Sequence, residues 1–332
     1  MNSEFHYYGV YYLCRKAEIP PKDSFIIAYS SQLVDDNITP YIIDTRWGEY
    51  SVQITMDYQW WGIKGDGATT IPFHFIPGEY REGAAKRNDG TGHRDLVTPG
   101  SARAKELLIA ALKTRNLYRV GIALHGYADT WAHQNFIGRN HPLNRMYSDS
   151  LLPPVGHAQA REMPDQFDLT WEDPRLIPEE RQVVNGDRIL EAARMIYKYL
   201  AHYNHRPFTD ADLVISGYAD LMGYPGFTKS RQERLLDLTI AQDIPPYDEN
   251  LWKSEAFIRE RDSSSEKLGK AYDRFLWLKD AVLNQMGAKS KAPPPVRRRR
   301  GKDDFFESSF YRWNEAAREH LRTARTIFGK SY

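Results

Sequence analysis

The segment formed by residues 125–133 constrains the fold of this chain more than any other. It reads His-Gly-Tyr-Ala-Asp-Thr-Trp-Ala-His, so that His125, Asp129 and His133 follow one another at intervals of four residues. On an α-helix this spacing places the three side chains along one stripe, one turn apart. The flanking residues are mainly apolar, which indicates that the stripe faces the protein interior. The segment therefore predicts a buried helix with three titratable groups on one face.

Three unpartnered titratable groups are costly in an apolar interior. A bound metal ion removes this cost, and two imidazoles with a carboxylate are ligands suited to zinc and its neighbours. The alternative is a hydrogen-bonded His–Asp–His network within the core, which satisfies the same groups without a metal. Both interpretations stay open on these three residues alone.

Helical periodicity covers most of the chain and predicts an all-α, multi-helix bundle around a buried polynuclear metal site. Helices are expected at about residues 4–17, 25–34, 101–115, 117–137, 179–203, 209–222, 228–241, 250–285 and 304–328. The period changes in one region, where residues 41–47 and the alternating residues 50–60 predict a small β-hairpin. Residues 62–100 and 138–178 are rich in Gly or Pro and are expected to form long loops.

The chain of 332 residues is expected to form a single domain, with a core at 1–205 and a helical extension at 206–332. The extension contains a basic, proline-containing segment at about residues 287–303, which we interpret as a mobile linker. A phosphate, lipid-headgroup or nucleic-acid patch is the alternative for its arginines at 297–300.

Charge and cysteine content narrow the classes of function. Lys and Arg number 45 against 44 Asp and Glu, which argues against a stable nucleic-acid partner held by bulk charge. Cys14 is the only cysteine, so a cysteine-ligated zinc is excluded and any metal site must consist of His, Asp and Glu. The N-terminal residues lack the pattern of a signal peptide, and no apolar stretch approaches the roughly 18 residues of a membrane span. We therefore expect a cytoplasmic protein on synthesis, with export by a signal-less route left open.

Further histidines and aspartates lie at expected helix ends or within the long loops. They are His6, Asp35, Asp36, His74, His157 and Asp165. A polynuclear site in a helical protein is built in this way, with one helix supplying several ligands and neighbouring segments supplying the others. Asp129 lies at the centre of the stripe and is suited to bridge two metals, because each carboxylate oxygen can bind one. Taken singly, each of the other residues also fits an ordinary polar helix end or loop position.

The order of these residues carries a resemblance. An N-terminal His, an acidic residue at the end of the next helix, a loop His, His-x3-Asp-x3-His and then Gly-His resemble the all-helical superfamily of zinc-dependent phospholipases C and fungal zinc-dependent single-strand nucleases. The phrases Phe5-His6-Tyr7-Tyr8 and Val34-Asp35-Asp36, together with residues 125–133, also resemble an uncharacterised bacterial domain family related to that superfamily. The resemblance spans roughly residues 5–200.

The resemblance implies a cluster of two or three zinc ions that share Asp129. It assigns His125, Asp129, His74 and an acidic residue at 35 or 36 to one zinc, Asp129 and His6 to a second, and His133 and His157 to a third. The superfamily usually supplies a Glu four residues after the last His, but Arg161 stands there, and Glu162 and Asp165 are the nearest substitutes. The member of the Asp35–Asp36 pair that is not a ligand would orient the attacking water.

These residues predict a metal-dependent hydrolase, and the resemblance implies a phosphodiesterase acting on phospholipid or a related phosphoester. Peripheral contact with a membrane is a further expectation, since Trp60 and Trp61 fall on the predicted hairpin. A nuclease is one alternative, and a helical binding or structural protein with a structural or decayed metal site is another. A metal phosphohydrolase of the HD type is disfavoured, because its adjacent His-Asp pair is missing here.

Overall fold

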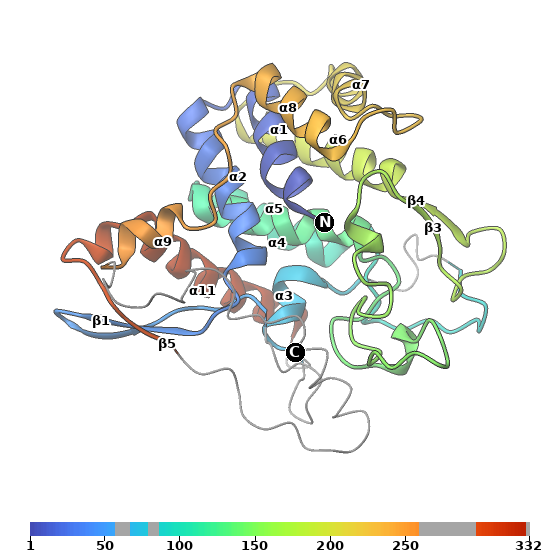
Figure 1. Cartoon of the computed structure of the whole chain (residues 1–332), viewed down its shortest axis with the longest axis horizontal. Helices are drawn as coiled ribbons and strands as arrows, with labels where there is room; N and C mark the ends of the chain where they lie inside the picture. The colour runs from blue at the N-terminus through green and yellow to red at the C-terminus, as the bar shows by residue number, and fades with distance from the viewer. Residues whose placement is uncertain (57–66, 79–85, 259–296, 330–332) are drawn as a thin grey trace.

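The computed structural model describes residues 1–56, 67–78, 86–258 and 297–329, and it is mainly helical (Figure 1). The α-helices are α1 (Val10–Lys16), α2 (Pro21–Asp36), α3 (Thr70–His74), α4 (Ala102–Lys113), α5 (Leu117–Ala132), α6 (Asn185–Tyr203), α7 (Ala211–Leu221), α8 (Arg231–Gln242), α9 (Leu251–Ala256) and α11 (Ser309–Phe328). The chain opens with a π-helix, η1 (Glu4–Gly9), and 3-10 turns occur at η2 (Pro142–Asn144), η3 (Met163–Asp165) and η4 (Phe305–Glu307). The expectation of a mainly helical fold is confirmed.

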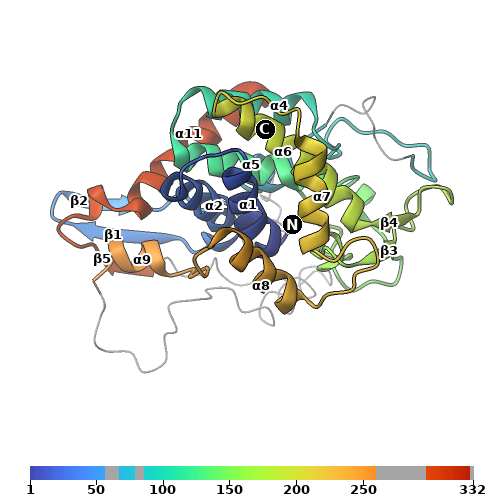
Figure 2. The same ribbon diagram turned by 90° about the horizontal axis from the view of Figure 1, so that it is seen from above.

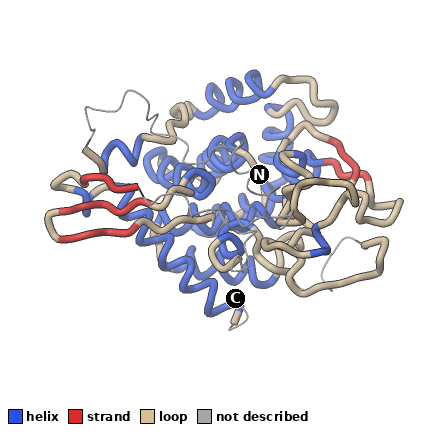
Figure 3. The backbone as a smooth tube through the Cα atoms, turned by 60° about the horizontal axis from the view of Figure 1, so that its bottom comes forward, coloured by secondary structure: helices blue, strands red, loops and turns tan. Residues whose placement is uncertain are grey.

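Two small sheets lie at opposite ends of the molecule (Figure 3). The first has the order β2-β1-β5, with β1 (Tyr41–Thr45) antiparallel to β2 (Gly48–Ser51) and parallel to β5 (Arg297–Arg300). Within it, Ile43 faces Tyr50 on one side and Arg299 on the other. The second is the antiparallel pair β3 (Thr170–Glu172) and β4 (Gln182–Val184).

Helix α5 is the central element, and α2, α3, α4, α6 and α11 pack around it (Figures 1 and 2). Its first turn is capped by Asn116, whose side chain accepts from the backbone N–H of Tyr118 and of Arg119. Two glycines let neighbouring backbones approach it. A Cβ atom at Gly121 would lie 2.2 Å from the carbonyl oxygen of Ile27 in α2, and one at Gly126 would lie 2.9 Å from that of Phe73 in α3.

Several helix boundaries differ from those expected. The helix expected at 117–137 ends at Ala132, because His133 leaves the helical conformation and Asn135 takes a positive φ of 66°. The helix expected at 179–203 begins at Asn185, since β4 and a turn precede it. The helix expected at 25–34 begins earlier, at Pro21. Proline suits the first turn of a helix, because a backbone N–H at that position would have no partner within the helix.

The expected β-structure and loops are corrected in a similar way. The hairpin expected at 41–60 ends at Ser51. The last part of its expected second strand, residues 57–60, lies outside the described residues, as does the pair Trp60 and Trp61. The loop expected at 62–100 contains α3. The helix expected at 250–285 forms α9 at its start, and residues 259–296 lie outside the described part. The linker expected at about 287–303 instead supplies a strand at 297–300, because its backbone pairs with β1.

No helix in the described ranges combines the length and the apolar character that crossing a bilayer would require.

Candidate metal centre

Eight titratable side chains from different parts of the chain come together beside α5. The helix itself carries His125 and Asp129, and His133 follows directly after its end. His74 is the last residue of α3, Asp35 lies in the last turn of α2, and His6 lies in η1. His157 comes from the loop before η3, and Asp165 ends η3. Within the described residues, these side chains form three groups that could each hold a metal ion: His6, His125 and Asp129; Asp35, His74 and His125; His133, His157 and Asp165.

Four side chains, Asp35, His74, His125 and Asp129, form a compact first ligand set, to which each contributes one atom. His125 Nε2 lies 3.1 Å from His74 Nδ1 and 3.2 Å from Asp129 Oδ2, and these last two atoms are 3.4 Å apart. Asp35 Oδ1 lies 3.5 Å from His125 Nε2 and 3.8 Å from His74 Nδ1. Ligand atoms placed about 2.1 Å from a tetrahedral zinc ion are separated by roughly 3.4 Å. The donor types and their spacing therefore fit a zinc ion.

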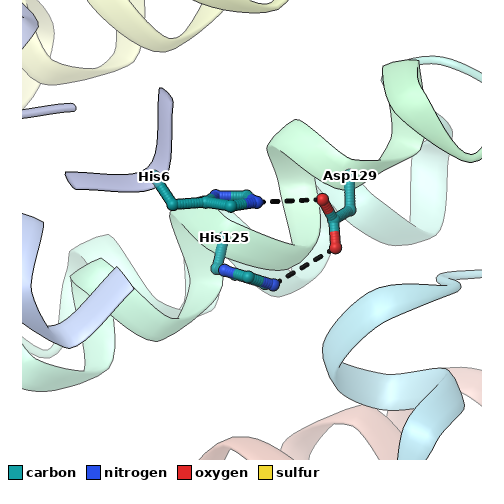
Figure 4. A group of neighbouring side chains, drawn as sticks. All are labelled: His6, His125 and Asp129. Carbon is teal, nitrogen blue, oxygen red and sulfur yellow. Dashed lines mark hydrogen bonds and ion pairs between the residues drawn. The ribbon is translucent and has the colours of Figure 1, made fainter. Parts of the chain in front are cut away.

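Asp129 presents its other oxygen to a second set of groups. Its Oδ1 atom lies 3.1 Å from His6 Nε2, while Oδ2 faces His125 (Figure 4). The amino group of Met1 donates to the same Oδ1 at 2.5 Å and lies 3.1 Å from Asp165 Oδ1. A positive charge thus lies between two carboxylates. Asp129 faces one set with each of its two carboxylate oxygens, so its position fits a bridging carboxylate.

The third group shows how two imidazoles are oriented. His133 Nδ1 donates to the carbonyl oxygen of His74, and His157 Nδ1 donates to that of Arg161, both at 2.7 Å. Because a carbonyl oxygen can only accept, each neutral ring carries its proton on Nδ1 and presents a lone pair at Nε2. These Nε2 atoms face Asp165, at 3.2 Å from Oδ1 and 3.7 Å from Oδ2. A lone pair facing a carboxylate oxygen needs a proton or a cation between them, and such backbone bonds are typical of metal-ligating histidines.

Burial prepares the imidazoles as neutral ligands. It lowers the pKa of His6 to about 4, with the Met1 amino group adding to the effect, and it also lowers the pKa of His74, His125 and His157. Neutral imidazole is the form that binds metals, so no proton has to be displaced from these rings at neutral pH.

The two central carboxyl groups are shifted in opposite directions. Burial acts to raise the pKa of Asp129, but the Met1 amino group and the surrounding imidazoles outweigh it and hold that pKa well below its usual range. Burial, and then the charge of Asp129, raise the pKa of Asp35 well above its usual range. A cation between the two carboxyl groups would favour the charged form of both.

Four buried atoms of the centre find no hydrogen-bond partner among the described residues. They are Nδ1 of His6, Nε2 of His74, Nδ1 of His125 and Oδ2 of Asp129. Buried polar atoms are normally satisfied, and exceptions call for an explanation such as a bound ion. A cation held by Asp129 Oδ2 would account for one of the four.

The structure distinguishes between the residues that sequence reasoning left as alternatives. Asp36 belongs to none of the three groups, because its Oδ2 atom accepts from the hydroxyl of Tyr247 at 2.5 Å and from Gln32 Nε2 at 3.1 Å. The same Gln32 amide lies 3.5 Å from Asp35 Oδ2. Of the pair Glu162 and Asp165, only Asp165 belongs to a ligand group.

The centre is buried on most sides and open on one part of its rim. The side chains of His6, His125 and Asp129 are at most 1% exposed, whereas those of Asp35, His157 and Asp165 are 29%, 22% and 19% exposed. Solvent therefore reaches the centre at these three side chains.

Sequence reasoning missed two groups beside the centre. Tyr247 is remote in the sequence, so no local pattern marks its bond to Asp36. Gln32 precedes Asp36 by one helical turn, so its place beside that carboxylate was readable from the i, i+4 spacing.

A family model described as "Family of unknown function (DUF6765)" matches residues 1–327. No curated protein and no solved structure matches the chain.

Proposed function

We propose that this chain, which belongs to the DUF6765 family of unknown function, is a metal-dependent hydrolase of phosphoric esters that holds two or three zinc ions. The observation that carries the proposal is the position of Asp129, whose two oxygens face two different sets of nitrogen and oxygen ligands. A carboxylate shared in this way is suited to a polynuclear centre. Histidine and carboxylate ligands without cysteine favour zinc or a similar divalent metal.

The proposed ligand sets follow the distances. Asp35, His74, His125 and Asp129 would hold one ion. Asp129 with His6, and Asp165 with His133 and His157, would hold the others. The open rim at Asp35, His157 and Asp165 gives a substrate its access to the centre.

When bound, neighbouring zinc ions lower the pKa of a water molecule towards neutrality and neutralise the charge that develops on a phosphoryl group. The aspartates beside the centre would orient the attacking water. Asp35 is the most exposed of the carboxylates in the centre, so we assign it the orienting of the attacking water as well as a ligand role. Asp36 holds the Gln32 amide, and the amide reaches Asp35, so Asp36 would orient Asp35 rather than touch the water.

The substrate class rests on the order of the ligands along the chain, which resembles that of the zinc-dependent phospholipases C. A phospholipid or related phosphoester is therefore the proposed substrate, and a nucleic acid is the alternative within the same chemistry. Trp47 supports peripheral contact with a membrane: it is 73% exposed between β1 and β2, with the Arg46 guanidinium 5.0 Å from its ring centre.

An activity screen tests the proposal. The purified protein, loaded with zinc, would be assayed on phosphatidylcholine vesicles, bis(p-nitrophenyl) phosphate and single-stranded DNA. We expect hydrolysis of at least one phosphoester, its loss on chelation and its return when zinc is added back. His125→Gln should abolish it, whereas His320→Gln, which changes a buried histidine bonded to the Pro72 carbonyl outside the centre, should not. A zinc-loaded protein inactive on all three substrates would overturn the proposed activity.

A purely structural metal site is the second candidate, and the deep burial of His6, His125 and Asp129 favours it. Asp35→Gln separates the two. If the protein is an enzyme, this variant should stay folded and lose activity, because Asp35 lies at the open rim. If the site is structural, the variant should lose stability, and the wild type should have no phosphoesterase activity.

A further inference from the structure

Helix α8 contacts the π-helix that carries His6, and one arginine makes the decisive contact. Arg234 is 1% exposed. Its Nε donates to Glu4 Oε1 at 2.5 Å and its Nη2 donates to Glu4 Oε2 at 3.2 Å, which is a buried, two-pronged ion pair. Its Nη1 donates to Asp168 Oδ2 at 3.1 Å and to the Lys229 carbonyl oxygen at 2.8 Å. The guanidinium thus joins three segments that are far apart in the sequence.

Two of these segments carry proposed ligands. Glu4 precedes His6 by two residues within η1, and Asp168 follows Asp165 by three residues. His6 and Asp165 approach Asp129 from these two segments: His6 lies 3.1 Å from Asp129 Oδ1, and the Met1 amino group contacts both Asp129 and Asp165. Arg234 itself makes no hydrogen bond or ion pair with any residue of the three ligand groups.

We propose that Arg234 is a positioning residue for the metal centre, which holds η1 and the segment after η3 at the separation that lets His6 and Asp165 act together with Asp129. The inference rests on the proposed metal centre. It also means that α8, which lies in the C-terminal half of the chain, is needed to complete a site whose ligands all lie between residues 6 and 165.

The chemistry of the contact supports positioning over simple stabilisation. A planar guanidinium that binds one carboxylate through two parallel bonds fixes both distance and direction. A buried ion pair, by contrast, adds little net stability, because the cost of removing both charges from water offsets their attraction. The first ligand set, formed by Asp35, His74, His125 and Asp129, lies on α2, α3 and α5, and neither printed carboxylate partner of Arg234 lies on these helices.

Metal binding and the docking of α8 should be thermodynamically linked, which allows a test that does not measure activity. If docking of α8 helps to assemble the ligands on η1 and η3, then metal binding at those ligands must in turn stabilise the docking of α8. Hydrogen exchange in residues 231–242 should therefore slow when zinc is added to the wild-type protein, and it should slow less in a variant without the ion pair.

The test measures zinc stoichiometry and affinity by titration of the metal-free protein. The variants are Arg234→Met, which keeps much of the volume, and Asp168→Asn, whose partially exposed side chain (40%) makes it the milder change. We expect the weakest zinc ion to bind about 10- to 100-fold less tightly in Arg234→Met, the range found when a group that orients a ligand is removed. Asp168→Asn should shift the same ion by less, and the tightest ion should keep its affinity in both. Lys229→Met is the matched control, because the Lys229 side chain bonds to Asp237 and to the carbonyl oxygens of Asp220 and Leu221, while the backbone carbonyl that accepts from Arg234 is kept.

The outcomes separate this inference from the proposed function. A wild-type protein that binds no zinc would overturn both. A wild type with a single zinc ion, or with two or more that Arg234→Met binds unchanged, would overturn the positioning role and leave a metal centre standing. Should Arg234→Met fail to fold, Asp168→Asn decides: unchanged zinc affinities and unchanged exchange in residues 231–242 would contradict the role.

Discussion

At the scale of single residues, the centre depends on which atom of each side chain faces inward. His133 and His157 are turned by hydrogen bonds to backbone carbonyls, so both present Nε2 to Asp165. The residue types of this arrangement were readable from the sequence, since His133 ends the stripe at residues 125–133 and His157 and Asp165 lie in the loop expected at 138–178. The orientation was not, because it depends on the carbonyl groups of His74 and Arg161 and thus on backbone that the pattern of side chains does not specify.

Asp35 and Asp36 provide a test at this scale. Asp35→Asn should weaken zinc binding about 10-fold or more, because an amide is a poorer ligand than a carboxylate and Asp35 faces both His74 and His125. Asp36→Asn should leave the number of bound zinc ions unchanged, because the Asp36 carboxylate accepts hydrogen bonds from Tyr247 and Gln32 and belongs to no ligand group. Titration of the metal-free proteins with zinc measures both. The reverse result, with Asp36→Asn losing the ion, would assign the ligand role to the other aspartate.

At the scale of helices, close packing brings the ligands of different elements within reach of one another. The sequence predicted α5 and most of its neighbours, because their apolar residues recur with helical period. The end of α5 at Ala132 was missed, and so was α3 within an expected loop, since five residues are too few to show a period. His74 reaches His125 because Gly126 lets α3 approach α5, a tertiary contact that no local pattern reveals.

The packing of α2 on α5 gives a second prediction. Gly121→Ala should destabilise the protein by about 1–3 kcal/mol, since the new methyl group meets the backbone carbonyl of Ile27, which cannot rotate away. Zinc affinity should fall too, because α2 carries Asp35. Chemical denaturation with chelator present measures the first effect. Gly217→Ala is the control: it lies in α7, and among the described residues its Cβ would meet the Tyr12 hydroxyl at 3.3 Å and no backbone atom within 4 Å. Equal stability of the two variants would contradict the packing argument.

Helix α11 supplies a prediction on pH. Burial lowers the pKa of His320 to about 4, although its bond to the Pro72 carbonyl opposes the shift. An unfolded histidine has a pKa near 6.5, so between about pH 6.5 and pH 4 the unfolded chain binds more protons than the folded protein. This group therefore lowers stability as the pH falls through that window, by up to about 3 kcal/mol.

The measurement is the difference in unfolding free energy between the wild type and His320→Gln in chelator. Wild type should lose stability relative to the variant between pH 6.5 and pH 4, with little relative change above pH 7. Parallel curves across that window would show that His320 is not held neutral by burial.

At the scale of the whole molecule, the candidate ligands lie between residues 6 and 165, and helix α8 from the C-terminal half packs against η1. The helical class and the list of ligand candidates followed from the sequence. The long-range pairings did not: β5 joins β1 in parallel, and α8 joins η1, across more than 200 residues. Local periodicity does not predict such pairings, because each depends on contacts between segments that are far apart in the sequence.

A site built from distant segments couples metal binding to global stability. Zinc that binds the folded protein and not the unfolded chain should stabilise it by about 2.7 kcal/mol when its free concentration is 100 times the dissociation constant. Thermal unfolding with zinc and with chelator measures the shift. His320→Gln should show the same zinc-dependent shift as the wild type, since the change lies outside the centre, and a melting temperature indifferent to zinc would contradict the coupling.

If Asp129 lies at the middle of a centre with more than one metal ion, elemental analysis of the purified protein should show it. The protein would be loaded with zinc, freed of excess metal by gel filtration and measured for zinc per chain, beside Asp129→Asn prepared in the same way. We expect two or three zinc equivalents for the wild type and at least one fewer for the variant, because one amide cannot replace two carboxylate oxygens. One zinc equivalent or fewer in the wild type, or the same zinc content in both proteins, would contradict a shared Asp129.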